Sequence, residues 1–301
     1  MTTSGHNIGR VGVVGLGIMG TAFTSNLLGG GFEVVGYDVA SDRVTGLVAA
    51  GGIAGLSPAD VAAQSNVVIT SLPSEAALEL VVSAEDGLVH GAGPGLIVIE
   101  MSTLGLKAKE AARAVLEAKR VATIDAPVSG TGLQAASGEI VIYGSGDREA
   151  LRRAGPVFDA LGTRTFDLGV FGNGSRMKYV ANLLVSVHNL ATAEAFVLGM
   201  KAGLDPQQIL ETISAGAGNS RIFEIRGPMM VANTYEPAAA RTEMSRKDVA
   251  LIAEFARSLG VPTPLLDASH SVYDEAIEAG FGGLDAAALC AVLERHAGLT
   301  R

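Results

Sequence analysis

Four polar residues recur at helical spacing on an otherwise apolar segment. Lys178, Asn182, Ser186 and Asn189 form one stripe within residues 174–202. Burying a lysine costs free energy unless a partner or a bound anion compensates its charge, and burial moves an ammonium group toward useful proton transfer. The stripe makes Lys178 a candidate proton donor or acceptor, and Asn182, one turn on, a candidate to hold a substrate oxygen. The alternative for Lys178 is an ordinary lysine near a helix start whose charged end reaches water.

A glycine-rich turn forms the second pattern. The predicted strand RVGVV runs into GLGIMG, which has the spacing G-x-G-x-x-G. In a dinucleotide-binding turn the first glycine allows the tight turn, the second lets the pyrophosphate approach the backbone, and the third lets the helix pack closely on the sheet. The spacing alone is a weak signal, but its place after the first strand and before a helix favours a bound dinucleotide. The predicted contacts are Gly15, Leu16, Gly17, Ile18, Met19 and Gly20.

An acidic residue follows the second predicted strand. Asp38 lies near the offset of about 20 residues at which a carboxylate binds the adenosine ribose hydroxyls. Such a carboxylate would repel a 2′-phosphate, so we expect NAD rather than NADP, although the nearby Arg43 could soften this preference. The alternative is that Asp38 only caps the next helix.

The segment DAPVSGTGLQAASGE, residues 125–139, is a candidate substrate loop. It follows a predicted strand and supplies Ser129, Gly130 and Thr131. Backbone N–H groups and hydroxyls in such a loop can bind a carboxylate. The alternative is a glycine-rich loop without a ligand.

The two halves of the chain differ in pattern. Short apolar runs alternate with helical stretches in the first half, which predicts a doubly wound parallel sheet. After Asp167 the strand signal stops, and the pattern is helical to the end. We therefore predict an α/β fold with a Rossmann domain over residues 1–167 and an all-helical substrate or oligomerisation domain over residues 168–301, joined by a long helix. The predicted strands are residues 10–14, 33–37, 67–71, 96–100, 122–125, 139–143 and 163–166, and the helical stretches between them include 21–28, 58–64 and 106–118. The later helices lie near 174–202, 220–232, 242–259, 263–279 and 285–297, and Asp205 caps a further helix that begins with Pro206.

The composition of the chain limits the classes of partner and compartment that we expect for it. A formal net charge of −9 argues against nucleic acid or an anionic membrane. The single cysteine, Cys290, fits a reducing compartment. The first residues, MTTSGHN, lack the apolar segment of a signal peptide, and no uninterrupted apolar run is long enough to span a bilayer. We expect a cytoplasmic protein without a metal, because the five histidines form no metal-binding pattern.

Together these segments resemble the β-hydroxyacid dehydrogenase family, the relatives of 3-hydroxyisobutyrate dehydrogenase and tartronate semialdehyde reductase. Four motifs carry the resemblance in order along nearly the whole chain. They are GLGIMG with the later Asn26-Leu27, DAPVSG, the GNGSRMKYVAN segment of residues 172–182, and the pair Lys247-Asp248.

The resemblance implies a role for several residues. Lys178 would be the general acid in reduction and would accept the proton in oxidation. Asn182 would orient the substrate, a small 3-hydroxy acid. Ser129 and Gly130 would bind the substrate carboxylate. The remaining cofactor and pocket residues would be Leu72 and Pro73 beside the adenosine, Thr103 beside the nicotinamide, and Lys247, which would complete the pocket. Tyr37–Val39 looks like the NAD-linked members.

Two positions depart from the family pattern. Thr131 stands where a second glycine is usual, and Arg221 stands where many members have an aromatic residue. Neither the particular 3-hydroxy acid nor the direction of the reaction follows from the sequence. The alternatives are an imine (C=N) reductase on the same scaffold and a dinucleotide-binding protein without turnover. The apolar surface of the helical half predicts a homodimer or homotetramer.

Overall fold

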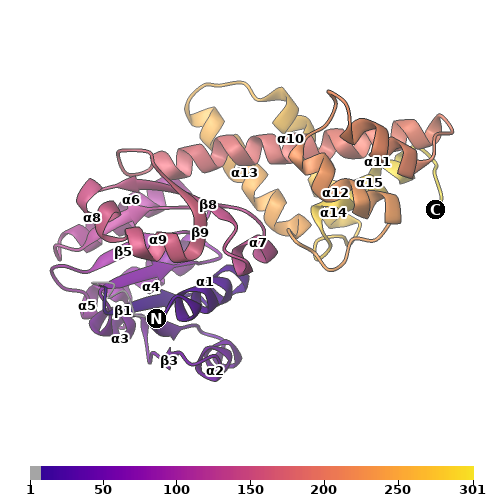
Figure 1. Ribbon diagram of the computed structural model, residues 1–301. Helices are drawn as coiled ribbons and strands as arrows, with labels where there is room; N and C mark the ends of the chain where they lie inside the picture. Colours follow the sequence, from indigo (N-terminus) through magenta and orange to yellow (C-terminus); the bar gives the residue numbers. More distant parts are fainter. Residues whose placement is uncertain (1–7) are drawn as a thin grey trace. The chain divides into compact units, whose positions relative to one another are not determined.

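The computed structural model describes residues 8–301, and these form two compact units (Figure 1). One unit runs up to Lys178, and the other is Tyr179–Arg301. The predicted α/β class, a Rossmann sheet followed by a helical domain, is confirmed. The domain boundary between residues 167 and 168 stays a prediction. The first seven residues, to which the signal-peptide argument applies, lie outside the described residues.

The first unit is built on one sheet. Its strands are ordered β3-β2-β1-β4-β5-β6-β8-β7, with β9 beside β8. All neighbours from β3 to β6 run parallel, but β8 is antiparallel to β6 and β7. The predicted parallel sheet is therefore confirmed from β3 to β6, and the sheet departs from it at β8, because the chain returns through β7 and the short helix α7 (Gly132–Ala136) without a crossover helix. The strands are β1 (Arg10–Val14), β2 (Glu33–Tyr37), β3 (Ile53–Ala54), β4 (Val67–Thr70), β5 (Ile97–Glu100), β6 (Ala122–Asp125), β7 (Val128–Ser129), β8 (Ile140–Gly146) and β9 (Gly162–Asp167).

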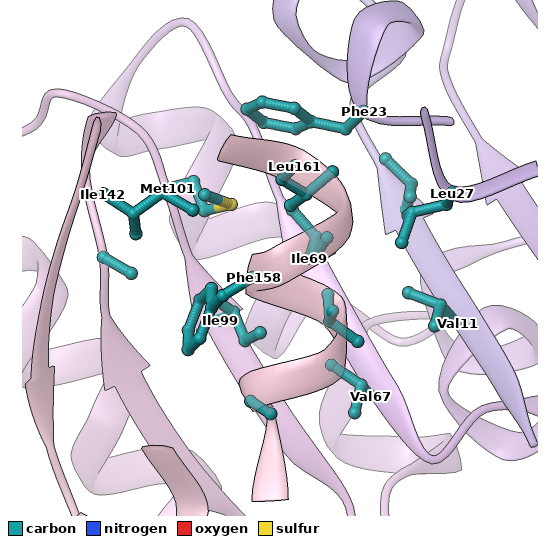
Figure 2. Close-up of a cluster of buried hydrophobic side chains, with 14 of the residues drawn as sticks. Val11, Phe23, Leu27, Val67, Ile69, Ile99, Met101, Ile142, Phe158 and Leu161 are labelled. Atoms are coloured by element: carbon teal, nitrogen blue, oxygen red, sulfur yellow. The ribbon is translucent and has the colours of Figure 1, made fainter. Parts of the chain in front are cut away.

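Alternate residues of the central strands face two separate cores. On one face Val67, Ile69 and Ile99 pack with side chains of α1 and α9, as Figure 2 shows for this core. On the other face Val68 and Val98 pack with α3, α4, α5 and α6. Because both faces are covered, the central strands are apolar throughout instead of alternating. The helices are α1 (Ile18–Gly29), α2 (Ser41–Ala49), α3 (Pro58–Gln64), α4 (Glu75–Ser83), α5 (Leu88–Gly91), α6 (Leu106–Glu117), α7 (Gly132–Ala136), α8 (Arg148–Arg153) and α9 (Gly155–Leu161).

The second unit is helical. The long helix α10 starts in the first unit and continues into the second, where its buried residues pack around Tyr273 and the segment of residues 286–290. Asp205 caps the following helix by accepting hydrogen bonds from Gln207 and Gln208, as its position before a proline predicts. The elements are α10 (Asn173–Lys201), α11 (Pro206–Ser214), α12 (Arg221–Ala232), α13 (Thr242–Ser258), α14 (Pro264–Glu278), the 3₁₀ turn η1 (Ala286–Ala288) and α15 (Leu289–His296).

Helix α10 is long and apolar enough to cross a bilayer by length and composition alone. Core helices of soluble proteins meet the same criterion, and Leu190, Phe196 and Val197 of α10 belong to the core of the helical unit. Asn189 is also fully buried there, and its amide donates to the Tyr273 hydroxyl and to the Ala286 carbonyl. Packing within the helical unit therefore accounts for part of the apolar composition of α10, whereas Val180, Leu184 and Leu198 of the same helix are exposed.

Candidate functional site

The glycine turn after β1 leaves room for a phosphate. A Cβ at Gly20 would lie 1.9 Å from the carbonyl oxygen of Gly15, so the helix packs too closely for any side chain there. Gly15 has a φ of +93°, which favours glycine. A Cβ at Gly17 would meet nothing within 4 Å, and no side chain caps the N-terminus of α1. The turn thus presents unpaired helix N–H groups beside open space, which suits the pyrophosphate of a dinucleotide.

Asp38 is built into this turn. Its Oδ2 accepts a hydrogen bond of 2.7 Å from the backbone N–H of Leu16, and its Oδ1 accepts one of 2.9 Å from Ala40. Arg43 Nη1 lies 3.2 Å from Oδ2, with its own side chain half exposed. The carboxylate does not cap α2, because the N-cap residue of that helix is Ala40 and no side chain caps it. Asp38 is instead bound to the turn itself through Leu16, and its contact with a ribose stays a prediction.

The candidate substrate loop lies against the same turn. Asn26 of α1 donates a 2.7 Å hydrogen bond to the carbonyl of Ala135 in α7. A Cβ at Gly132 would lie 2.4 Å from Cγ2 of Ile18, which follows the glycine turn directly. Residues more than a hundred positions apart in sequence are thus neighbours, and the predicted cofactor and substrate segments occupy one place in the first unit.

Within this loop Thr131 has a local task. Its side chain accepts a hydrogen bond from the backbone N–H of Gln134, and its own N–H donates to Oε1 of Gln134 at 2.9 Å. This is a capping box, which starts α7. Gly130 has a φ of +150°, and a Cβ there would lie 2.7 Å from Ile140. Of the three residues predicted to bind the substrate carboxylate, only Thr131 takes part in this capping box. Ser129 and Gly130 do not.

The first turn of α10 is anchored at the start of the substrate loop. Asp125, at the end of β6, accepts hydrogen bonds of 2.8 Å from both the N–H and the hydroxyl of Ser175. Gly174 donates to the hydroxyl of Ser145, which itself donates to the carbonyl of Asp125. Lys178 lies one turn beyond Ser175 and is half-buried. The helix that carries the candidate acid–base residue is therefore fixed to the segment DAPVSG.

The other cofactor candidates also follow carboxyl ends of parallel strands. Leu72 and Pro73 follow β4, and Thr103 follows β5. The backbone N–H of Leu72 donates to the hydroxyl of Ser102 at 2.8 Å, which joins these two segments. Ligands of open α/β sheets bind outside the carboxyl ends of the strands, so this edge is where a dinucleotide is expected.

Two further candidates meet within the helical unit. The amide of Asn182 donates to Oδ2 of Asp248 at 2.8 Å, and Nζ of Lys247 lies 3.8 Å from the other carboxylate oxygen. Asp248 therefore holds Asn182 in place, a role that the sequence analysis missed. Arg221 is three-quarters exposed and pairs with Glu224 at 3.1 Å, which is a surface ion pair.

A buried charge cluster lies in the first unit, and none of the sequence motifs marks it. Lys109 of α6 is fully buried, with its ammonium 2.6 Å from Glu100 and 2.8 Å from Asp125. The available signal was that Glu100 and Asp125 both end buried, adjacent strands, where two carboxylates need a cation. Among residues 8–301, no group of three or more His, Cys, Asp or Glu side chains is arranged to hold a metal ion.

A Rossmann sheet with an open dinucleotide turn, followed by a helical unit, defines a nicotinamide-dinucleotide oxidoreductase. Residues 10–170 match the family described as the NAD binding domain of 6-phosphogluconate dehydrogenase. Residues 172–293 match the family described as NAD-binding of NADP-dependent 3-hydroxyisobutyrate dehydrogenase. The chain belongs to the β-hydroxyacid dehydrogenase family, and it is an NAD(P)-dependent oxidoreductase acting on hydroxy acids.

Relatives align along nearly the whole chain. L-threonate dehydrogenase of Cupriavidus necator is 35% identical over 281 residues, which cover 93% of this chain and 94% of the relative. NAD-dependent L-serine dehydrogenase of Pseudomonas aeruginosa is 32% identical over 282 residues, covering 92% and 95%. A crystal structure of 3-hydroxyisobutyrate dehydrogenase from Salmonella typhimurium superposes with a TM-score of 0.85 at 31% identity, covering 94% and 99%. An imine reductase from a Pseudomonas species, at 21% identity and a TM-score of 0.62, shares the fold alone.

Proposed function

We propose that this enzyme interconverts a small 3-hydroxy acid and its 3-oxo acid, with NAD as the redox partner. The observation that carries the proposal is the junction of three segments in the first unit. The substrate loop packs on the dinucleotide turn through Asn26 and Gly132, and Asp125 fixes the first turn of the Lys178 helix to the start of that loop. A bound carboxylic acid would thus lie between the cofactor and Lys178.

Each residue then has a distinct task. Ser129 and the backbone of Gly130 bind the substrate carboxylate, because Thr131 is engaged in its capping box. The C3 hydroxyl lies at Lys178, which takes its proton in oxidation and returns it in reduction. Asn182, held by Asp248, orients the same hydroxyl, and Lys247 completes the pocket. The dinucleotide, when bound, supplies the hydride acceptor at its nicotinamide ring.

The environment of Asp38 supports NAD over NADP. Its nearly buried carboxylate stands beside the dinucleotide turn, where it would accept hydrogen bonds from a ribose diol and repel a 2′-phosphate. Arg43 is paired with that carboxylate, so its charge is already partly compensated. We therefore expect a kcat/KM that is moderately higher with NAD than with NADP.

The assembled enzyme is proposed to be a soluble cytoplasmic homodimer that pairs through α10. In the helical unit this helix exposes Val180, Leu184, Ala191 and Leu198, with the half-buried Val187 between them. From Val180 to Ala191 these positions recur every three or four residues, and Leu198 follows seven residues later, past the exposed Glu194. This is the spacing of the seam that one helix presents to another, and it suits a second copy of the same helix. A monomeric mass by light scattering would refute this assembly.

The experiment is a panel of small 3-hydroxy acids carrying methyl, amino or hydroxyl groups at C2, assayed for reduction of NAD and of NADP. The names of the relatives place L-serine and L-threonate in the panel. Turnover with one subclass, and a higher kcat/KM with NAD, is expected. Tight NAD binding with no turnover on any member would favour the non-catalytic alternative.

A further inference from the structure

Lys109 has an environment unlike that of a surface lysine. Its ammonium lies within 2.6–2.8 Å of Glu100, Asp125 and the carbonyl oxygen of Ser102, and its side chain has no exposed surface. Burial lowers the pKa of the ammonium, but the charges of Glu100 and then Asp125 outweigh this effect, so the net pKa is raised. Lys109 is therefore a permanent cation inside the first unit.

One cation faces two carboxylates, and the remaining charge is balanced by backbone groups. The N–H of Ser102 donates to Glu100 at 3.0 Å. Asp125 accepts the N–H and hydroxyl of Ser175 in the first turn of α10. The N-terminus of a 29-residue helix carries partial positive charge, which favours a carboxylate there. The first turn of α10 therefore offsets part of the negative charge that the second carboxylate leaves.

The carboxylates of Glu100 and Asp125 connect Lys109 to different parts of the candidate site. Through Glu100 and Ser102, Lys109 holds the end of β5, which continues to Thr103 and supports Leu72 by a hydrogen bond. Through Asp125 and Ser175, it holds the turn of α10 that precedes Lys178. A single ammonium therefore joins the segment that faces the cofactor to the helix that carries the acid–base residue.

We propose that Lys109 is a positioning residue, which fixes the first turn of α10 and Lys178 relative to the cofactor-side segment after β5. This inference rests on the proposed function, since it assigns Lys178 to proton transfer. Lys109 does not touch substrate or cofactor. It acts on the alignment of groups that do, and misplacement of a reacting group by about 1 Å costs on the order of 100-fold in rate.

The first test compares Lys109→Met with Lys107→Met, which removes an exposed lysine from the same helix. With Lys109→Met, kcat should fall by at least about tenfold, because Lys178 and the cofactor-side segment are no longer held together. The Kd for NADH should rise by a smaller factor, because Leu72 and Thr103 lose support while the glycine turn and Asp38 lie outside the cluster. Lys107→Met should leave both unchanged. A normal kcat for Lys109→Met would overturn the proposal.

A double variant separates positioning from charge balance. Glu100→Gln with Lys109→Met removes one charge of each sign, and Asp125 keeps Ser175 and the helix N-terminus. Stability should therefore recover relative to Lys109→Met alone. The connection that Lys109 makes between the segment after β5 and Asp125 is still missing, so kcat should stay low. Recovery of kcat together with stability would show that Lys109 only balances charge, and would overturn the proposal.

Hydrogen exchange tests the connection between the segment after β5 and the first turn of α10 without an activity measurement. In Lys109→Met, peptides covering residues 70–76 and residues 172–178 should both exchange faster, although about a hundred residues separate them. Leu116→Ala, which creates a cavity elsewhere on α6, is the control for general loss of stability. Unchanged exchange at residues 172–178 would refute this connection between Lys109 and the first turn of α10. Failure of the proposed function would appear differently, as a wild-type enzyme without turnover.

Discussion

The glycine turn permits a sharp test, because its second and third glycines differ in what surrounds them. A Cβ at Gly17 meets nothing within 4 Å, whereas a Cβ at Gly20 would lie 1.9 Å from the carbonyl oxygen of Gly15. Gly17→Ala should therefore fold normally and lose cofactor affinity. Gly20→Ala should lose stability, because α1 cannot remain at its present distance from the turn.

The magnitudes follow from the geometry. Gly17 has a φ of −68°, which alanine adopts freely, so the folding cost is that of a poorer N-cap residue, up to about 1 kcal/mol. Its methyl group would displace the pyrophosphate from one or two helix N–H groups. Each charge-assisted hydrogen bond is worth about 1.5–3 kcal/mol, so the loss of one should raise the Kd for NADH by about 10- to 150-fold, and the loss of two should raise it further. At Gly20 the overlap requires a shift of about 1 Å and should cost about 1–3 kcal/mol or more.

The assay is a titration of each variant with NADH, followed by cofactor fluorescence, together with a thermal melt. Gly17→Ala should bind weakly and melt close to wild type. Gly20→Ala should melt lower, by about 2–4 °C for each kcal/mol in a domain of this size. Normal NADH affinity in Gly17→Ala would show that the open space beside the turn is not the pyrophosphate site.

Four other outcomes are expected. Lys178→Ala should lower kcat by about 10²–10⁴-fold with unchanged NADH binding, and a near-normal kcat would remove it from the mechanism. Asp38→Asn should raise the ratio of kcat/KM with NADP to that with NAD, measured with one substrate, whereas an unchanged ratio would separate Asp38 from cofactor choice. Leu184→Glu should yield a monomer by light scattering, while a matched exposed change, Lys107→Glu, should not. Burial, and then the charge of Glu294, raise the pKa of the Cys290 thiol to about 12, so at pH 8 it stays protonated and should react with a thiol reagent only after unfolding.

The sequence predicts well the features that neighbouring residues determine. The glycine spacing after β1, the cap at Asp205 and the apolar runs of the central strands are local patterns, and the structure confirms each of them. It predicts poorly the elements whose residues do not form a clear pattern. Among the helices between the strands, only α1, α3 and α6 were located by residue range, and the antiparallel β8 replaced an expected parallel strand.

In the candidate site, too, the local motifs could be predicted and the contacts between distant segments could not. Motifs located the glycine turn, the substrate loop and the Lys178 helix, but not the contacts that join them. Lys109, Asp125 and Ser175 are spread over 66 residues, and nothing in the spacing of α6 marks Lys109 as the one lysine of that helix turned inward. Asp248 likewise reaches Asn182 only through the packing of α13 on α10. Such pairs are set by tertiary packing, which single-sequence periodicity does not contain.

The central claim is that hydride moves between C3 of a hydroxy acid and the nicotinamide ring. The most direct measurement uses the best substrate of the panel with deuterium at C3, and follows the label into the reduced dinucleotide by mass spectrometry. One deuterium should appear in the dinucleotide for each turnover. Reduced dinucleotide without label, or labelled only when the deuterium is placed at C2, would contradict it.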